Sequence, residues 1–304
     1  MCRSLSRGFV VLAAAIACLV CTAQSCFASE RLKAVASFSI LADIVENIGG
    51  ERIEVSTLVG RNGDSHVFAP TPADVRRVAD AKIVFVNGLG LEGWLPRLVK
   101  SSGSKGSIVV ASKGIKPLKA ANGHSHDHDH ADPHAWQSVA NVKIYVANIR
   151  DALIASDSPS ESVYRSNTEK YLARLDALDR DVRDAVAKIP AERRKVISTH
   201  DAFGYFAAAY GIAFIAPQGV STESEPSARD IAAIISQIRR QRIPAVFLES
   251  AGDPRLMQRI AAETGAKIGG TLYSDSLTEE KGAAPTYIDM VRHNIKTLSS
   301  ALSN

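Results

Sequence analysis

Residues 32–59 read LKAVASFSILADIVENIGGERIEVSTLV, and this stretch decides the fold because its apolar periodicity changes twice. Residues 32–37 form a short apolar run typical of a buried strand. Residues 40–48 are apolar at helical spacing and end at two glycines, a common helix stop. Residues 53–59 predict a second strand. A strand, a helix and a second strand in this order favour a sheet covered by helices.

The same alternation continues along the chain and then repeats in its second half. Thr71 and Pro72 open a helix as cap and first-turn proline, ahead of further strands at 83–87 and 107–111. The second half predicts strands at 195–199, 213–216, 245–249 and 266–268, a loop at 269–276, and helices at 202–210, 227–240, 254–264 and 287–302. Each half therefore predicts an α/β lobe with a parallel or mixed sheet.

Residues 158–190 form the longest periodic segment, apolar at every third or fourth position and charged on the opposite face. We interpret this segment as a long rigid helix that links the two lobes across a cleft, where ligand sites commonly lie. The predicted organisation is a signal peptide at 1–28, an N-terminal lobe at 29–157 with a His-rich loop at 123–132, the linking helix at 158–190, and a C-terminal lobe at 191–304.

The N-terminus is typical of a cleaved secretory signal. Arg3 and Arg7 precede an apolar run at 9–20, and small residues follow down to residue 28. The run is shorter than the roughly 20 residues that span a bilayer. All four cysteines lie before residue 28, so the predicted mature chain holds no disulfide. We expect a periplasmic protein without a lipid anchor, because the residues before Cys18 and Cys26 match a lipobox poorly.

Composition excludes one broad class of partner. The formal net charge is +4, no Lys/Arg cluster dominates, and aromatic residues make up 6% of the chain. A nucleic-acid surface needs a concentrated basic patch or stacking aromatics. We therefore expect a monomeric globular protein that binds no nucleic acid.

Residues 123–136 read GHSHDHDHADPHAW and combine two kinds of histidine. Alternating imidazoles and carboxylates cannot form an apolar core, and such a composition is typical of loops that bind metal. A flexible linker or an engineered tag is the alternative. His134 differs, because the preceding proline stiffens the chain just ahead of a predicted helix. The looser histidines are His124, His126, His128 and His130.

Three histidines and one aspartate occupy turns next to predicted strands or helices: His66, His134, His200 and Asp275. Taken singly, each histidine is more often a surface residue or a hydrogen-bonded core residue than a metal ligand. In open α/β sheets, however, strand ends face the ligand crevice. Two ligands from each half would hold one cation between the lobes.

Five segments resemble one family, the metal-binding solute receptors of bacterial zinc and manganese ABC importers. They are SFSILADIVENIGGERIEVSTLVG at 37–60, GDSHVFAPTPADV at 63–75, DPHAW at 132–136, STHDAFGYFAAAYGI at 198–212 and GTLYSDSL at 270–277. The resemblance covers the predicted mature chain. It implies two α/β sandwich lobes joined by a rigid helix, ligand roles for His66, His134, His200 and Asp275, and an ABC permease with its ATPase as partners.

Three imidazoles and one carboxylate suit tetrahedral Zn²⁺. Manganese-selective members of the family typically carry glutamate where this chain has His200, so the resemblance indicates zinc and leaves Mn²⁺ as the second choice. It also implies that the loose histidines recruit metal or accept it from a periplasmic metallochaperone. Glu249 ends a strand near His200, and we expect it either to accept the histidine's second ring N–H or to form a salt bridge between structural elements.

Two other functions remain open at this stage. A zinc hydrolase would need an open coordination position and a general base, and the chain lacks HExxH and any Ser or Cys nucleophile motif. We therefore expect no enzyme activity. An adhesin or zinc-buffering protein would use a surface that no sequence motif marks.

Overall fold

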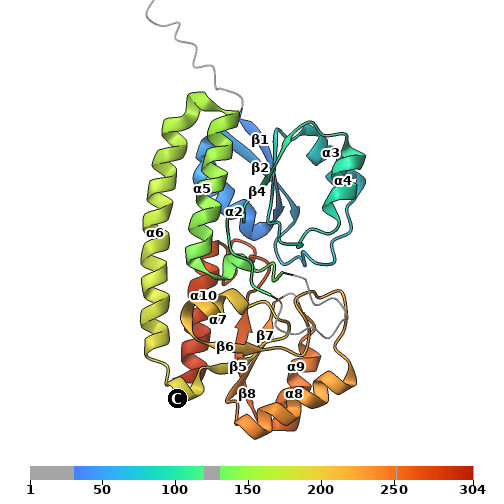
Figure 1. Cartoon of the computed structure of the whole chain (residues 1–304), viewed down its shortest axis with the longest axis vertical. Coiled ribbons are helices and arrows are strands. Elements are labelled where there is room, and N and C mark those ends of the chain that lie inside the picture. Colours follow the sequence, from blue (N-terminus) through green and yellow to red (C-terminus); the bar gives the residue numbers. More distant parts are fainter. Residues whose placement is uncertain (1–30, 120–130, 251, 304) are drawn as a thin grey trace, which may run out of the picture. The chain divides into compact units, whose positions relative to one another are not determined.

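The computed structural model describes residues 31–119, 131–250 and 252–303. Residues 32–304 form one compact unit, which contains two four-stranded sheets (Figure 1). The first sheet has the order β2-β1-β3-β4, and the second has the order β6-β5-β7-β8. All strand pairs within both sheets are parallel, which decides between the predicted parallel and mixed sheets. The two sheets repeat one strand order.

The first sheet consists of β1 (Leu32–Phe38), β2 (Ile53–Val59), β3 (Ile83–Val86) and β4 (Ser107–Val110). Its helices are α2 (Ser39–Gly49), α3 (Pro72–Asp80) and α4 (Leu95–Ser102). Alternate residues of β1 point to opposite faces: Val35 joins the core under α3 and α4, and Ala34 joins the core under α2.

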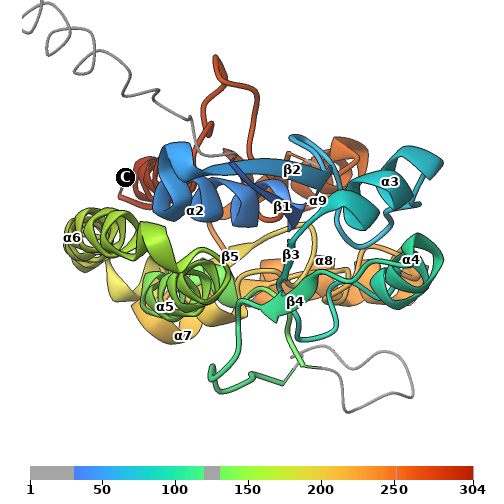
Figure 2. The same ribbon diagram turned by 90° about the horizontal axis from the view of Figure 1, so that it is seen from above.

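The second sheet consists of β5 (Lys195–Ile197), β6 (Ala213–Ile215), β7 (Ala245–Glu249) and β8 (Lys267–Leu272). Its helices are α7 (Gly204–Tyr210), α8 (Ala228–Gln241), α9 (Pro254–Thr264) and α10 (Tyr287–Leu302). Val246 packs in the core under α8 and α9, whereas Phe247 packs on the α10 side. Helices therefore cover both faces of each sheet (Figure 2).

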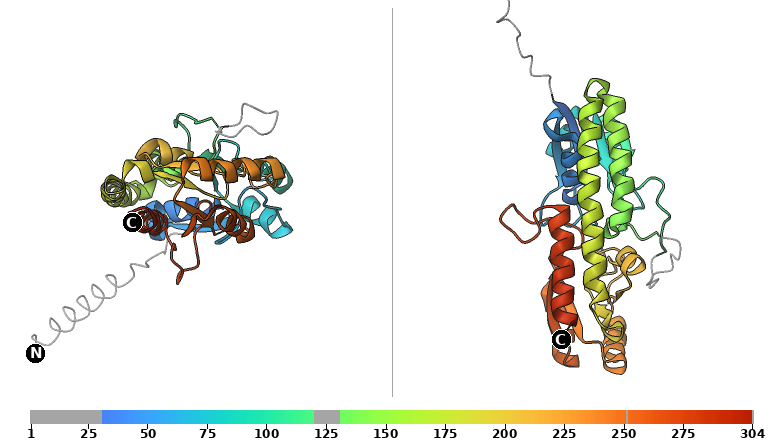
Figure 3. Two further views of the ribbon diagram at one scale, coloured as in Figure 1. Left: turned by 90° about the horizontal axis from the view of Figure 1, so that it is seen from below. Right: turned by 90° about the vertical axis from the view of Figure 1, so that its left-hand side faces the viewer.

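One long helix, α6 (Glu161–Ala187), lies along both lobes (Figure 3). It contacts α2 and α5 (Val139–Ser156) beside the first sheet, and α7 and α10 beside the second. Its 27 residues span about 40 Å at about 1.5 Å per residue. The buried residues share the spacing of three or four seen in the sequence and are Tyr164, Thr168, Tyr171, Leu175, Leu178, Val182 and Val186.

The structure confirms the two-lobe α/β fold, but the exact lobe boundaries stay a prediction because residues 32–304 form one unit. The predicted signal peptide at 1–28 and most of the His-rich loop at 123–132 lie outside the described residues. None of the helices in the described part of the chain is long and apolar enough to cross a membrane.

One local prediction was wrong. Residues 269–272 continue strand β8 instead of starting a loop. A Cβ on Gly269 would lie 2.5 Å from the Phe247 ring, and Gly270 has φ +130°, so the glycines let a bulged strand pass close to its neighbour.

Candidate metal centre

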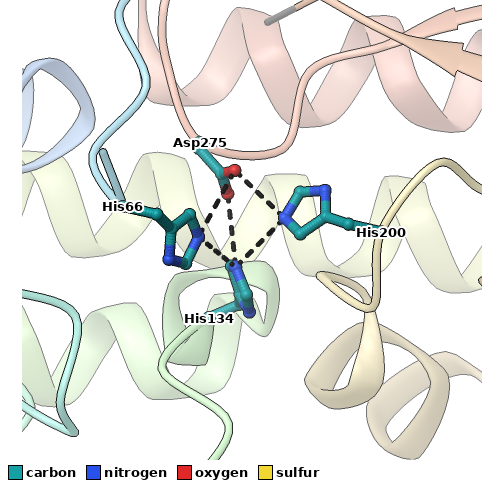
Figure 4. Close-up of side chains that lie close together, drawn as sticks. All are labelled: His66, His134, His200 and Asp275. Carbon is teal, nitrogen blue, oxygen red and sulfur yellow. Dashed lines mark hydrogen bonds and ion pairs between the residues drawn. The ribbon is translucent and has the colours of Figure 1, made fainter. Parts of the chain in front are cut away.

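The four predicted ligands come from four separate connections and point toward one another (Figure 4). His66 lies between β2 and α3, and His134 precedes a short 3-10 turn at Ala135–Gln137. His200 follows β5, and Asp275 follows β8. All four are buried, with at most 7% of each residue exposed. One donor atom from each lies within 4.8 Å of all the others.

The spacing of these donor atoms matches a tetrahedral ion. The Nε2 atoms of His66 and His134 are 3.3 Å apart, and those of His134 and His200 are 3.4 Å apart. The Asp275 carboxylate lies 3.1 Å from His200 Nε2, 3.5 Å from His134 Nε2 and 3.8 Å from His66 Nε2. Four ligands about 2.0–2.1 Å from a tetrahedral zinc are about 3.3 Å from one another. Five of the six donor pairs therefore have separations close to this value, and no pair is more than 4.8 Å apart.

The electrostatics of the site also suit a cation. Burial alone would raise the pKa of Asp275, but the neighbouring His200 and His134 hold it below its usual value. The Asp275 carboxylate is therefore ionised, and its Oδ1 has no hydrogen-bond partner among the described residues. Burial lowers the pKa of His66 to about 4, so this imidazole is neutral. A buried anion with an unpaired oxygen is expected to bind a positive partner.

His200 differs from His66 because two carboxylates flank it. Burial lowers the pKa of His200, but Glu249 and Asp275 outweigh burial and raise it well above its usual value. A cation must therefore displace a proton from His200 before it binds there, whereas His66 needs no such step.

Two carboxylates contact the outer ring nitrogens of the ligands. Glu249 Oε2 lies 2.6 Å from His200 Nδ1, and Asp132 Oδ1 lies 2.8 Å from His134 Nδ1. Each contact orients the ring so that Nε2 faces the shared centre. Glu249 therefore lies where it can accept the second ring N–H of His200, which is the first of its two predicted roles. Asp132 was not among the residues predicted from the sequence, although the Asp-Pro-His spacing beside His134 was a usable signal.

Backbone groups hold both carboxylates in turn. Glu249 Oε1 accepts the backbone N–H groups of Thr199 and His200 at 2.8 and 3.0 Å, and its Oε2 accepts the Ser274 hydroxyl at 2.8 Å. Asp132 also accepts the His134 backbone N–H at 2.9 Å. The expected ligands and the groups that orient them therefore form one connected network.

A cavity of about 360 Å³ adjoins His200 and Asp275. Asp64, Glu225 and Asp253 line it, and so does Arg255, which forms an ion pair with Asp253. Asp64 also accepts the His66 backbone N–H at 2.8 Å and the Thr222 hydroxyl at 2.7 Å. The cavity therefore brings polar and charged groups beside two of the four predicted ligands. The predicted recruiting residues, His124, His126, His128 and His130, lie outside the described part of the chain.

Comparison with known proteins agrees with this geometry. The model of one family, described as the periplasmic component A of the zinc-uptake complex, matches residues 34–301. The chain belongs to this family. Its members are metal-binding, extracytoplasmic substrate-binding proteins of zinc and manganese ABC importers and not enzymes. The resemblance inferred from the sequence is thus confirmed, as is the expectation of no enzyme activity.

The relatives of this family member differ in the metal for which they are named. The manganese-binding lipoprotein MntA of Halalkalibacterium halodurans is 37% identical, over 97% of both chains. The iron-binding protein YfeA of Yersinia pestis is 34% identical, over 89% of this chain and 86% of its own. The structure of the periplasmic zinc-binding protein TroA of Treponema pallidum is similar to this chain with a TM-score of 0.84 and 30% sequence identity. The match covers 90% of this chain and 100% of TroA. Family membership therefore leaves the metal open.

Proposed function

We propose that this protein is a high-affinity Zn²⁺ receptor that delivers zinc to an ABC permease, whose ATPase drives import. The observation that carries the proposal is the spacing of the four buried donor atoms, which lie within 4.8 Å of one another. His66, His134, His200 and Asp275 are the proposed ligands. With all four positions supplied by the protein, the ion would be held without an open position for a reactive water.

Zinc is favoured over manganese by the donor types. Three neutral imidazoles and one carboxylate are the borderline set that suits Zn²⁺, whereas Mn²⁺ prefers more oxygen donors. Manganese is the second candidate, because MntA is named for it and is 37% identical to this chain.

Zinc capture requires proton release. The pKa of His200 is raised well above its usual value, since Glu249 and Asp275 outweigh burial, so the incoming ion competes with a proton at this imidazole. His66 is neutral and ready to bind. Affinity is therefore expected to fall as the pH falls. In this proposal the histidines at 124–130 collect zinc or receive it from a periplasmic metallochaperone, and the buried site retains it.

The proposed location is the periplasm, after cleavage of the signal near residue 28. The sequence predicts that the mature protein has no lipid anchor. The relatives do not support this prediction, because MntA is named a lipoprotein. Intact-mass measurement of the mature protein decides the point. A mass matching a chain that begins near residue 29 supports simple cleavage, and added acyl mass on an N-terminal cysteine contradicts it.

Metal competition tests the proposed function directly. Protein purified without added metal, then stripped, should bind one Zn²⁺ per chain and retain it against an excess of Mn²⁺. The His134→Ala variant should lose this tight binding. Retention of Mn²⁺ over Zn²⁺ would instead support the manganese receptor, and the absence of tight binding of either metal would refute a receptor function.

A growth experiment separates import from adhesion or storage. A strain that lacks the protein should grow poorly under zinc chelation and recover with added zinc. Normal growth of this strain under chelation would contradict the import proposal, whatever the protein binds in solution.

A further inference from the structure

The segment that carries Asp275 belongs to the second lobe in sequence, but much of its backbone is bonded to the first lobe. The Ser274 carbonyl accepts the Trp136 indole N–H and the Gln137 amide, both at 2.8 Å. Leu277 accepts the Asn62 backbone N–H at 2.9 Å and donates its own N–H to the Ser39 hydroxyl at 3.0 Å. Groups on the first lobe therefore hold the chain on both sides of Asp275.

Arg61 donates two hydrogen bonds to this segment from a single nitrogen atom. Its Nη1 donates to the carbonyl of Thr278 at 2.6 Å and to the carbonyl of Pro285 at 2.7 Å. These two carbonyls lie at the neck of a loop, which the Thr278 N–H also closes by donating to Ala284 O at 2.9 Å. One guanidinium nitrogen thus joins both ends of the loop that follows Asp275; this loop precedes α10 (Figure 3).

The position of Arg61 in the chain gives these bonds their significance. Arg61 lies five residues before His66, and Thr278 lies three residues after Asp275. The Arg61 side chain therefore ties the loop of one proposed ligand to the loop of another, across the two lobes. Hydrogen bonds from a charged donor are stronger than bonds between neutral groups.

Two acidic side chains of α2, Asp43 and Glu46, interact electrostatically with Arg61. Asp43 accepts the Tyr287 backbone N–H at 3.0 Å, at the start of α10. Burial raises the pKa of Asp43 to about 6, and the nearby charge of Arg61 partly opposes this rise. Burial likewise raises the pKa of Glu46, and Arg61 again opposes it. The guanidinium therefore lies near two α2 carboxyl groups as well as the loop carbonyls.

We propose that Arg61 is a positioning residue for metal binding, which places the Asp275 carboxylate by fastening its loop to the lobe that carries His66 and His134. The inference rests on the proposed receptor function and adds a residue that touches no metal. Loss of Arg61 leaves all four proposed ligands in the chain and the bonds at Ser274 and Leu277 intact, but it removes two of the contacts that fix the position of the Asp275 loop.

This proposal predicts an unequal effect on two metals. Zn²⁺ keeps three imidazole ligands when Asp275 moves, whereas Mn²⁺ depends more on carboxylate oxygen. In Arg61→Gln the Mn²⁺ affinity should fall about tenfold, equivalent to about 1.4 kcal/mol, and the Zn²⁺ affinity should fall less, about threefold. A role in general folding would weaken both metals to the same extent.

Chelator competition with Zn²⁺ and Mn²⁺, together with thermal unfolding of the metal-free protein, tests the proposal in wild type, Arg61→Gln and Arg61→Lys. Lysine keeps the charge but cannot reproduce the guanidinium's geometry, so it should give a smaller change in the Zn²⁺/Mn²⁺ affinity ratio than glutamine. It also serves if the glutamine variant fails to fold. Arg77→Gln is the matched control, because Arg77 Nη1 also donates to a carbonyl, Thr57 O at 2.7 Å, away from the site.

An increased Zn²⁺/Mn²⁺ affinity ratio in Arg61→Gln, a smaller one in Arg61→Lys and no change in Arg77→Gln would support the positioning role. Wild-type affinities in both Arg61 variants would overturn it. Equal losses for the two metals with a lowered unfolding temperature would overturn it as well, since they indicate a general structural role. If wild type itself binds neither metal, the receptor function fails, a result distinct from failure of the Arg61 role alone.

Discussion

Glutamine at position 249 should weaken metal binding although Glu249 is not one of the proposed ligands. Glu249 Oε1 accepts two backbone N–H groups, those of Thr199 and His200. Its Oε2 faces His200 Nδ1 at 2.6 Å and the Ser274 hydroxyl at 2.8 Å. A glutamine of the same shape keeps its carbonyl oxygen toward the backbone donors. Its NH₂ group then replaces Oε2 and faces His200 Nδ1.

The NH₂ group donates and cannot accept, so a neutral His200 must turn Nδ1 into the acceptor. Its proton then resides on Nε2, the atom that lies 3.1 Å from Asp275 at the centre of the site. A protonated Nε2 cannot coordinate a metal. Losing an outer partner of this kind typically costs 10- to 100-fold in affinity, or about 1.4–2.7 kcal/mol. We expect Glu249→Gln to fall in this range.

The effect should depend on pH in a defined direction. The Glu249 carboxylate raises the pKa of His200 against the effect of burial. It therefore strengthens the binding of the competing proton to His200 as well as the binding of the metal. In Glu249→Gln a proton competes less strongly with the metal at His200, and at lower pH this offsets part of the loss in metal affinity. The difference between wild type and Glu249→Gln should therefore grow as the pH rises from roughly 6 to roughly 8.

Competition with a chelator of known affinity measures this difference in stripped protein. Asp74→Asn is the matched control, since Asp74 is also buried and accepts a backbone N–H and a hydroxyl from Thr71, but contacts no ligand. The control should bind metal as wild type does. Unchanged affinity in Glu249→Gln across the pH range would refute the orienting role, provided that the variant remains folded by circular dichroism.

Three further predictions concern Asp132, Asp43 and the histidine-rich segment. Asp132→Asn should lower metal affinity about tenfold through His134, and an affinity equal to wild type would contradict this. Burial raises the pKa of Asp43 from 3.8 to about 6. The free energy of unfolding should therefore fall as the pH rises through this window, by up to about 3 kcal/mol at about 1.4 kcal/mol per pH unit. Urea unfolding of Asp43→Asn should not show this fall, and the same pH dependence in the variant would refute the prediction. Deleting residues 124–130 should slow zinc loading and leave the tight site intact, and loss of that site in isothermal titration would refute the recruiting role.

The sequence predicted those parts of the fold that depend on neighbours in the chain. Strands β2 and β7 and helices α9 and α10 have the predicted bounds, because apolar periodicity and flanking breakers are local signals. The start of α3 was also predictable, since Thr71 and Asp74 form a capping box with each other.

The end of β8 was not predictable from the sequence. Two adjacent glycines normally indicate a loop. The Phe247 ring would lie 2.5 Å from a Cβ on Gly269, and Gly270 has φ +130°, so tertiary packing and backbone conformation explain why the strand needs glycine at both positions. The missing side chain makes room for a neighbour from another strand. No pattern within residues 266–272 contains that information.

For the site, the sequence by itself supplied the four candidate ligands, since each lies at a strand end or a stiff turn and the family resemblance indicated the same residues. Only the tertiary structure brings residues 66, 134, 200 and 275 to within 4.8 Å of one another. It alone also reveals Arg61, whose partners are the backbone carbonyls of Thr278 and Pro285. Every residue has a backbone carbonyl, so an acceptor of this kind leaves no mark in the sequence, and folding alone selects which two of them the guanidinium meets.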